Sequence, residues 1–218
     1  MDDYKNLVIF DLDGVLIDSK DIHYKALNEA LALVNKKFII SPRDHITIFD
    51  GLTTKTKLEY LINKRKFPKS KSEFVYQNKQ KFTDKYLLKQ ISINKELNKD
   101  LKRLSKKFKL ALATNCIKKT MNQMIKQLQI EEYFDFTICN EDIKKPKPHS
   151  EIYLRTILEF GLNPKEVLIL EDSNIGRKAA INSGANIFPI EEPENDVKYE
   201  KIMNAINKYN KSDNRIKW

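Results

Sequence analysis

Phe10-Asp11-Leu12-Asp13-Gly14-Val15-Leu16-Ile17-Asp18-Ser19 is the stretch of sequence that decides the fold, and a mostly apolar run at residues 6–10 leads into it. An apolar run that stops at polar residues and a glycine is typical of a buried strand that ends in a turn. A chain that turns at Gly14 can bring Asp11 and Asp13 into one pocket, although they would point apart on an extended strand. One carboxylate of such a pair can attack as a nucleophile while the other moves a proton. The alternative is an acidic turn without chemistry.

Four later apolar runs end in polar residues in the same way. They cover residues 108–113, 134–139, 167–170 and 186–190, and amphipathic stretches of helical length separate them at about 117–129, 149–161 and 174–183. Strands that alternate with helices indicate a parallel sheet covered on both faces. We therefore predict an α/β fold with a doubly wound, Rossmann-like parallel sheet. Ligands of such sheets bind beyond the carboxyl ends of the strands, where these polar residues converge.

The interval from about residue 17 to 90 interrupts this alternation, because it has no comparable strand pattern and reads as several helices. The Ser-Pro at 41–42 indicates a helix start, and the turn at 51–54 precedes another helix. We predict a catalytic core formed by residues 1–16 and 92–207 and a small helical cap at 17–91, inserted after the first strand. The polar residues 208–218 are expected to form a frayed tail.

Composition narrows the class of protein. The 218 residues carry a net charge of +10, and no apolar run is long enough to span a bilayer. The positive charge is mostly lysine, which argues against nucleic-acid binding, and its excess between residues 15 and 95 either steers anionic substrates or covers solvated helix faces. Cys116 and Cys139 indicate no disulfide framework. We expect a cytoplasmic protein, monomeric or weakly dimeric, without membrane or nucleic-acid partners.

Three further motifs follow in order along the chain. They are Thr114-Asn115, then Lys145-Pro146-Lys147-Pro148 followed by Tyr153, then Glu171-Asp172-Ser173-Asn174-Ile175-Gly176. Together with the Asp11 motif they resemble the haloacid dehalogenase superfamily over about residues 6–190, in its β-phosphoglucomutase and phosphoglycolate phosphatase branch. Taken singly, each has a plainer interpretation as a turn, a solvated lysine or a helix cap.

The resemblance implies a set of catalytic roles. Asp11 would attack phosphorus to form an aspartyl phosphate, and Asp13 would protonate the leaving oxygen and later activate water. Thr114 and Asn115 would hold phosphoryl oxygens, while Lys145 would offset the charge that Asp11 shares with the phosphoryl group.

The resemblance also implies a magnesium cofactor. Mg²⁺ prefers hard oxygen ligands. The expected ligands are the Asp11 carboxylate, the Asp13 carbonyl and Asp172, with Glu171 either directly bound or one shell further out.

Substrate selectivity would come from the cap. The expected substrate-binding residues, besides Asn115, are His23, Gly51, Thr54, Lys55 and Lys81, with Lys79 as an alternative to Lys81. His23 matches a histidine that couples Asp13 to cap closure in the mutase-like branch, or it is an ordinary polar residue of the first cap helix.

Within the superfamily the sequence favours one activity over two others. Dehalogenases need no second acid, so Asp13 argues against that chemistry. Mutases of this branch carry an arginine in the cap turn that grips a second phosphate, and residues 51–55 contain none. We therefore predict a phosphatase acting on a small phosphorylated metabolite such as a sugar phosphate. A β-phosphoglucomutase-like phosphomutase, and a non-catalytic binding protein that uses the basic cap, remain the alternatives.

Overall fold

A five-stranded parallel sheet forms the centre of the computed structural model, which describes residues 6–211. The strand order is β3-β2-β1-β4-β5, and β1 (Leu7–Phe10) pairs with β2 on one side and β4 on the other. The other strands are β2 (Lys109–Ala113), β3 (Phe136–Ile138), β4 (Val167–Glu171) and β5 (Asn186–Pro189). All five predicted strands are present, and the predicted α/β class is confirmed.

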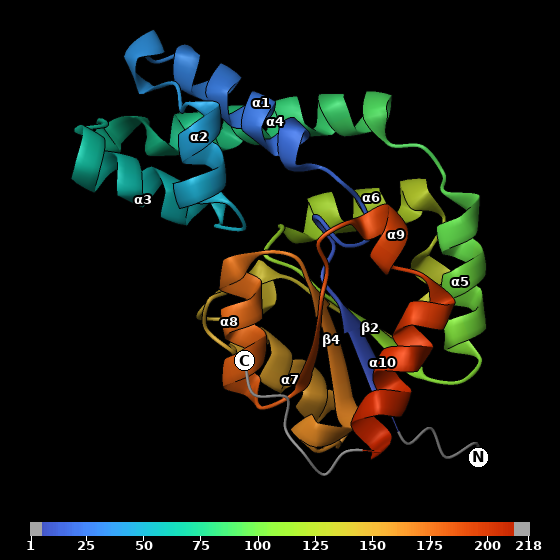
Figure 1. Cartoon of the computed structure of the whole chain (residues 1–218). Helices are drawn as coiled ribbons and strands as arrows, with labels where there is room; N and C mark the ends of the chain where they lie inside the picture. Colours follow the sequence, from blue (N-terminus) through green and yellow to red (C-terminus); the bar gives the residue numbers. More distant parts are fainter. Residues whose placement is uncertain (1–5, 212–218) are drawn as a thin grey trace.

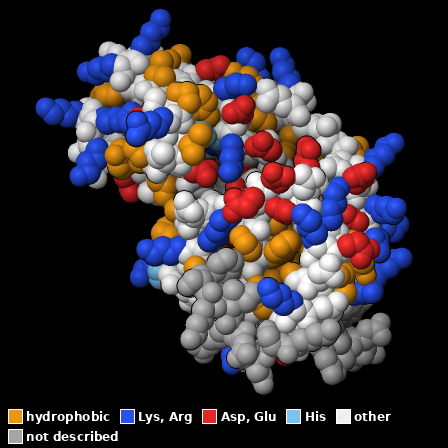
Figure 2. Space-filling model, viewed as in Figure 1, with side chains coloured by type: hydrophobic (Ala, Val, Ile, Leu, Met, Phe, Trp, Pro, Cys, Tyr) orange, Lys and Arg blue, Asp and Glu red, His pale blue; other side chains and the backbone are white. Residues whose placement is uncertain are grey.

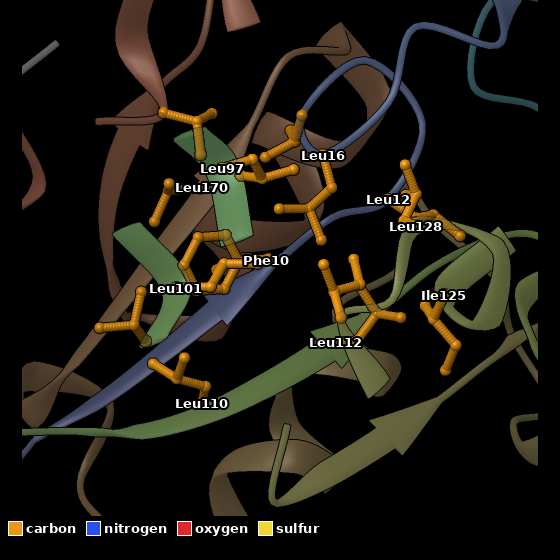
Figure 3. Packing of buried hydrophobic residues seen from close by; sticks show 14 of the residues in the cluster. Phe10, Leu12, Leu16, Leu97, Leu101, Leu110, Leu112, Ile125, Leu128 and Leu170 are labelled. Atoms are coloured by element: carbon orange, nitrogen blue, oxygen red, sulfur yellow. The ribbon is translucent and has the colours of Figure 1, made fainter. Parts of the chain in front are cut away.

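Helices cover both faces of this sheet (Figure 1). They are α5 (Lys95–Ser105), α6 (Lys118–Leu128), α7 (Glu151–Glu159), α8 (Asn174–Ser183), α9 (Pro193–Asp196) and α10 (Tyr199–Lys211). Successive residues of a strand face opposite sides, so Val8 and Phe10 pack with α5, α6 and α10, whereas Leu7 and Ile9 pack with α7 and α8. Figure 3 shows the first of these clusters, in which Leu101 lies beside the ring of Phe10. The strands are thus buried on both faces, as their continuous apolar runs predict.

The chain between β1 and α5 is helical and has an apolar core of its own, which includes Leu27, Phe49 and Leu61. Its helices are α1 (Lys20–Ala32), α2 (Pro42–Asp44), a π-helical turn (His45–Phe49), α3 (Thr54–Arg65) and α4 (Ser72–Gln90). Single 3₁₀ turns occur at Lys36–Phe38, Lys69–Lys71, Glu131–Tyr133, Asn140–Asp142 and Pro164–Glu166. Figure 1 shows α1 to α4 as a separate layer, joined to the sheet part by the segments that follow β1 and α4. We refer to residues 20–90, which contain α1 to α4, as the helical layer, and to the rest of the described chain as the sheet part.

Sequence signals at two helix starts are borne out in this layer. The Ser41 hydroxyl accepts a hydrogen bond from the Asp44 amide at 3.1 Å, and Pro42 occupies the first helical position. The Thr53 hydroxyl accepts from the Thr56 amide at 3.2 Å and caps α3. Each hydroxyl satisfies an amide that has no partner inside its helix.

The predicted frayed tail begins too early. Helix α10 continues to Lys211, and the Tyr209 hydroxyl donates to the carbonyl of Ile187 on β5 at 2.6 Å. The aromatic ring of Tyr209 packs against the core, and this contact outweighs the polar composition around it. The prediction is therefore wrong for residues 208–211, and residues 212–218 lie outside the described part of the chain. Among the described helices, none has the length and apolar character needed to cross a bilayer.

We expect Leu101→Ala to lower the free energy of unfolding by about 2 to 5 kcal/mol, because it opens a cavity in a fully buried part of α5. The same change at Leu158 on α7, whose side chain is 78% exposed, should cost less than about 0.5 kcal/mol. Urea unfolding followed by circular dichroism measures both. Equal losses would contradict the packing of α5 against the sheet.

Candidate active site

Three buried charged side chains meet at the carboxyl ends of β1 and β4. The Lys147 ammonium lies 2.8 Å from Asp11 Oδ1 and 2.5 Å from Glu171 Oε1, and it also donates to the Ala113 carbonyl at 2.9 Å. Burial lowers the pKa of Lys147, but the two carboxylates outweigh it and raise the pKa above its ordinary value. Burial raises the pKa of Asp11 well above its usual range, and Lys147 acts in the opposite direction. Lys147 is therefore the cation that favours an ionised Asp11.

The sequence-based choice of Lys145 for this position is wrong. Lys145 is exposed, and its amide donates to the Glu151 carboxylate at 2.9 Å near the start of α7. Lys147 is held instead by Asn115, whose Oδ1 accepts from the Lys147 amide at 3.2 Å and whose Nδ2 donates to the Lys147 carbonyl at 3.3 Å. With its backbone fixed in this way, the Lys147 side chain reaches Asp11. The local sequence does not distinguish Lys147 from Lys145, because each of these lysines directly precedes a proline.

Glu171 is fixed from several sides. Besides Lys147, its carboxylate accepts a hydrogen bond from the Tyr153 hydroxyl, and the Ser173 hydroxyl donates to Oε2 at 3.3 Å. A Cβ atom on Gly176 would overlap this carboxylate, so glycine lets the first turn of α8 approach closely. These contacts fix the Glu171 carboxylate, which in turn holds the Lys147 ammonium in position.

The Asp172 carboxylate is buried next to Asp11 and Glu171 and is paired with Lys20. Asp11, Glu171 and Asp172 each present a carboxylate oxygen, and these atoms lie within 4.8 Å of one another. Among the residues that the structure describes, none gives either oxygen of Asp172 a hydrogen bond of good geometry, although Lys20 Nζ lies 2.7 Å from Oδ2. Burial raises the pKa of Asp172 to about 6, against the effect of Lys20. A buried carboxylate that is held by a single lysine keeps free lone pairs on its oxygens, and such oxygens are the hard ligands that fit Mg²⁺.

The turn after β1 brings the first motif close to this group. Gly14 has a φ of +82°, and a Cβ atom there would overlap the Asp172 carboxylate. Only glycine combines this backbone conformation with such a close approach. Asp11 and Asp172 therefore face one another across the ends of β1 and β4.

Asp13 lies in a separate cluster that includes residues of the helical layer. Its carboxylate accepts hydrogen bonds from the Ser19 hydroxyl and, at 2.7 Å, from the Cys116 thiol, and it lies 3.2 Å from His23 Nε2. The Lys79 ammonium is 3.2 Å from the other ring nitrogen of His23. Burial raises the pKa of Asp13, but His23 and Cys116 outweigh it and lower the pKa. Burial raises the pKa of the Cys116 thiol well above its usual range, so Cys116 acts as a donor.

Thr114 and Asn115 follow β2 as predicted, and they line a cavity that Asp11 and Asp13 also line. The Thr114 hydroxyl accepts from the Cys116 amide at 3.0 Å. Asn115 Nδ2 donates to the Gly51 carbonyl at 3.0 Å, which connects the sheet part to the helical layer. Gly51 has a φ of +67°, and a Cβ atom there would lie 2.8 Å from Ile175 Cγ1 and 3.1 Å from the Ser173 hydroxyl. The two parts of the molecule are therefore in close contact at Gly51.

A cavity of about 610 Å³ lies between the helical layer and the sheet part. The predicted cap residues that line it are His23, Gly51, Thr54 and Lys55. Lys81 is exposed and does not line it, so that choice is wrong; two residues along α4 correspond to about 200° around a helix. Lys79, the alternative, is buried and lines the cavity, as does Lys57 on α3, which sequence reasoning missed.

Comparisons with known proteins show which proteins this chain resembles in sequence. The sequence pattern of haloacid dehalogenase-like hydrolases matches residues 8–190. A phosphorylated carbohydrates phosphatase of Thermotoga maritima is 28% identical over 215 residues, covering 91% of this chain and 97% of that protein. A phosphoglycolate phosphatase of Aquifex aeolicus is 30% identical over 183 residues, covering 82% of this chain and 81% of that protein.

Solved structures share the arrangement of helices and strands. A β-phosphoglucomutase from Clostridium difficile superposes with a TM-score of 0.79 at 23% identity, covering 94% of this chain and 98% of that one. At this identity the likeness concerns the fold. Taken with the sequence match over residues 8–190, the comparisons show that the chain belongs to the haloacid dehalogenase-like hydrolase family.

Proposed function

We propose that the protein is a Mg²⁺-dependent phosphatase that hydrolyses a small phosphate monoester, such as a sugar phosphate, through an aspartyl phosphate on Asp11. One observation carries this proposal. The buried Asp11 carboxylate, paired with Lys147, lies close to the Asp172 carboxylate, which only Lys20 approaches within the described residues, on the wall of a cavity that has room for a small metabolite. A nucleophile, a counter-charge and metal ligands are thereby gathered within one site.

The chemistry divides into two displacements. In the first, an Asp11 oxygen attacks phosphorus, the bond from phosphorus to the ester oxygen breaks, and Asp13 donates a proton to the leaving oxygen. In the second, Asp13 accepts a proton from water, which attacks the same phosphorus and releases phosphate and Asp11. The lowered pKa of Asp13 favours its ionised form, which suits the second displacement. The first requires a protonated Asp13 and hence a rearrangement of the hydrogen bonds from Ser19 and Cys116.

Magnesium would be held by Asp11, Asp172 and the Asp13 carbonyl, with Glu171 behind them. When bound, the ion supplies positive charge that offsets the negative charge of the phosphoryl group. Lys147 supplies further positive charge directly at Asp11 Oδ1. Thr114 and Asn115 would orient phosphoryl oxygens once Asn115 exchanges its bond to Gly51.

We propose that residues 17–91 act as a cap that closes over the cavity and excludes water. Contacts between the two parts support this role, because Lys20 pairs with Asp172 and Asn115 bonds to Gly51.

Hydrolysis is preferred to phosphomutase chemistry, since no arginine of the described chain lines the cavity and two relatives are named phosphatases. We place the enzyme in the cytoplasm, acting on a metabolite.

Steady hydrolysis of p-nitrophenyl phosphate is expected in the presence of Mg²⁺ and should stop when the ion is chelated. Asp11→Asn should lower kcat on the order of 1,000-fold or more, because an amide does not form the phosphoryl intermediate. Colorimetric assay of released nitrophenol measures both effects. Undiminished turnover in Asp11→Asn would eliminate the proposal.

Lys147→Met and Lys145→Met form a matched pair that tests the assignment of the active-site cation. We expect Lys147→Met to lower kcat/KM at least about 100-fold, because an uncompensated buried charge remains beside Asp11. Lys145→Met should stay within about twofold of wild type, since the Lys145 side chain is exposed. The Lys147→Met, Glu171→Gln double variant removes one of the two acids left unpaired, so a double variant that is folded by circular dichroism but inactive separates lost chemistry from lost folding. Activity in either Lys147 variant close to wild type would refute the assignment.

Lys20 pairs with Asp172 Oδ2, so we expect it to compete with Mg²⁺ for this carboxylate. Lys20→Met should lower the Mg²⁺ concentration for half-maximal binding by about two- to fivefold, the range expected for loss of one partly exposed ion pair. Calorimetric titration with Mg²⁺ measures this, and Lys25→Met, an exposed lysine of the same helix, is the control. Weaker metal binding in Lys20→Met would show that Lys20 assists the metal.

A further inference from the structure

Asp13, His23 and Cys116 bring an oxygen, a nitrogen and a sulfur atom together on the wall of the cavity. One such atom from each residue lies within 4.8 Å of the other two, and all three residues line the cavity. They come from separate segments, namely the turn after β1, helix α1 and the residues that follow β2. The proposed reaction uses Asp13 to move protons, but it gives the Cys116 thiol no task. The thiol therefore calls for an explanation of its own.

The spacing of the three atoms is close to that of ligands in a tetrahedral zinc site. In such a site, bonds of about 2.0 to 2.3 Å place neighbouring ligand atoms about 3.4 to 3.6 Å apart. Here His23 Nε2 lies 3.2 Å from Asp13 Oδ1 and 3.9 Å from Cys116 Sγ. Cys116 Sγ lies 2.7 Å from Asp13 Oδ2, because these two atoms share a hydrogen bond. Small rotations of the three side chains would place them around one ion.

The types of ligand atom separate this cluster from the magnesium group. Asp11, Glu171 and Asp172 offer carboxylate oxygens, which suit Mg²⁺. A thiolate and an imidazole next to one carboxylate are instead the ligands that Zn²⁺ prefers. Three protein ligands leave the fourth position of a tetrahedron to a water molecule from the cavity. The two groups of side chains therefore select different metals.

We propose that Asp13, His23 and Cys116 form a binding site for Zn²⁺ that is distinct from the magnesium site and inhibits the enzyme when it is occupied. Binding converts the Cys116 thiol to a thiolate, and its proton leaves to solvent. The ion bridges the helical layer and the sheet part, since His23 belongs to α1 and Cys116 follows β2. The inhibition, unlike the binding, rests on the proposed function, because a carboxylate bound to zinc does not transfer a proton to the ester oxygen.

Lys79 competes with zinc for His23. Its ammonium lies 3.2 Å from His23 Nδ1, and as a donor it leaves the ring proton on Nε2, the nitrogen that faces Asp13 and Cys116. Zinc binding therefore moves the ring proton to Nδ1 and turns Lys79 away from the ring. Lys79→Met should tighten Zn²⁺ binding about three- to tenfold, since it removes a nearby positive charge and the competing hydrogen bond. Calorimetric titration with Zn²⁺ in saturating Mg²⁺ measures this change.

Cobalt reports the site directly, because Co²⁺ bound to a thiolate gives a charge-transfer band in the near ultraviolet that oxygen ligands do not give. The protein is titrated with Co²⁺ in saturating Mg²⁺, which keeps the oxygen ligands occupied. We expect the wild-type band to saturate at one equivalent and to disappear when Zn²⁺ is added. Cys116→Ser should abolish the band, and His23→Gln should weaken Co²⁺ binding at least about tenfold. Cys139→Ser is the matched control and should keep the band, since Cys139 is the other cysteine of the chain and does not line the cavity.

Zinc should also inhibit p-nitrophenyl phosphate hydrolysis in saturating Mg²⁺. The zinc concentration for half-inhibition should be at least about tenfold higher in Cys116→Ser than in wild type, each protein being compared with its own zinc-free rate. Equal inhibition of the two proteins would place zinc at the magnesium ligands and overturn the inhibitory role. If wild type hydrolyses no ester, the proposed function fails, and the cobalt titration still decides the site.

The site itself is overturned if wild type gives no thiolate band, or if the band persists in Cys116→Ser or depends on Cys139. Weaker zinc binding in Lys79→Met would contradict coordination through His23 Nε2. Circular dichroism of each variant separates lost binding from lost folding. If Cys116→Ser does not fold, Lys79→Met decides, because tighter binding cannot result from misfolding.

Discussion

The ammonium of Lys147, held between the carboxylates of Asp11 and Glu171, is the interaction on which the rest of the site depends. Two acids at the ends of neighbouring parallel strands would repel each other in a buried position, and one cation between them compensates for both. The arrangement fixes where β1 and β4 end relative to each other. It also explains why the loop before α7 is anchored by Asn115 and why the first turn of α8 contains a glycine, Gly176, close to Glu171.

The sheet part and the helical layer are linked through the groups that would carry chemistry. His23 approaches Asp13, Lys20 pairs with Asp172, and Asn115 bonds to the backbone of Gly51. Movement of the helical layer would therefore change the surroundings of both acids at once. Figure 2 shows acidic side chains gathered where the two parts meet, below a helical layer whose outer surface carries many lysines and arginines. Inside the cavity, Lys55, Lys57 and Lys79 line the side formed by the helical layer and favour the binding of anionic molecules.

Local sequence pattern was enough to predict the strands, most helices and the residues that follow strand ends, including Asp11 and Asp172. It was not enough to choose between two lysines two positions apart. Lys145 and Lys147 differ in the structure because Asn115, distant in sequence, fixes the backbone of one of them. In α4, by contrast, the sequence pattern distinguishes the buried Lys79 from the exposed Lys81. Buried residues recur every four positions at Val75, Lys79, Thr83 and Leu87, a stripe that includes Lys79 and leaves out Lys81.

Gly51 has a mechanical consequence. Its backbone lies so near Ile175 and Ser173 that even a methyl group would push the opposing walls apart. The absence of a side chain there sets the minimum aperture between the two halves of the molecule, and so the degree to which bulk solvent is shut out during a reaction. Any bulkier residue at position 51 would hold the two halves further apart.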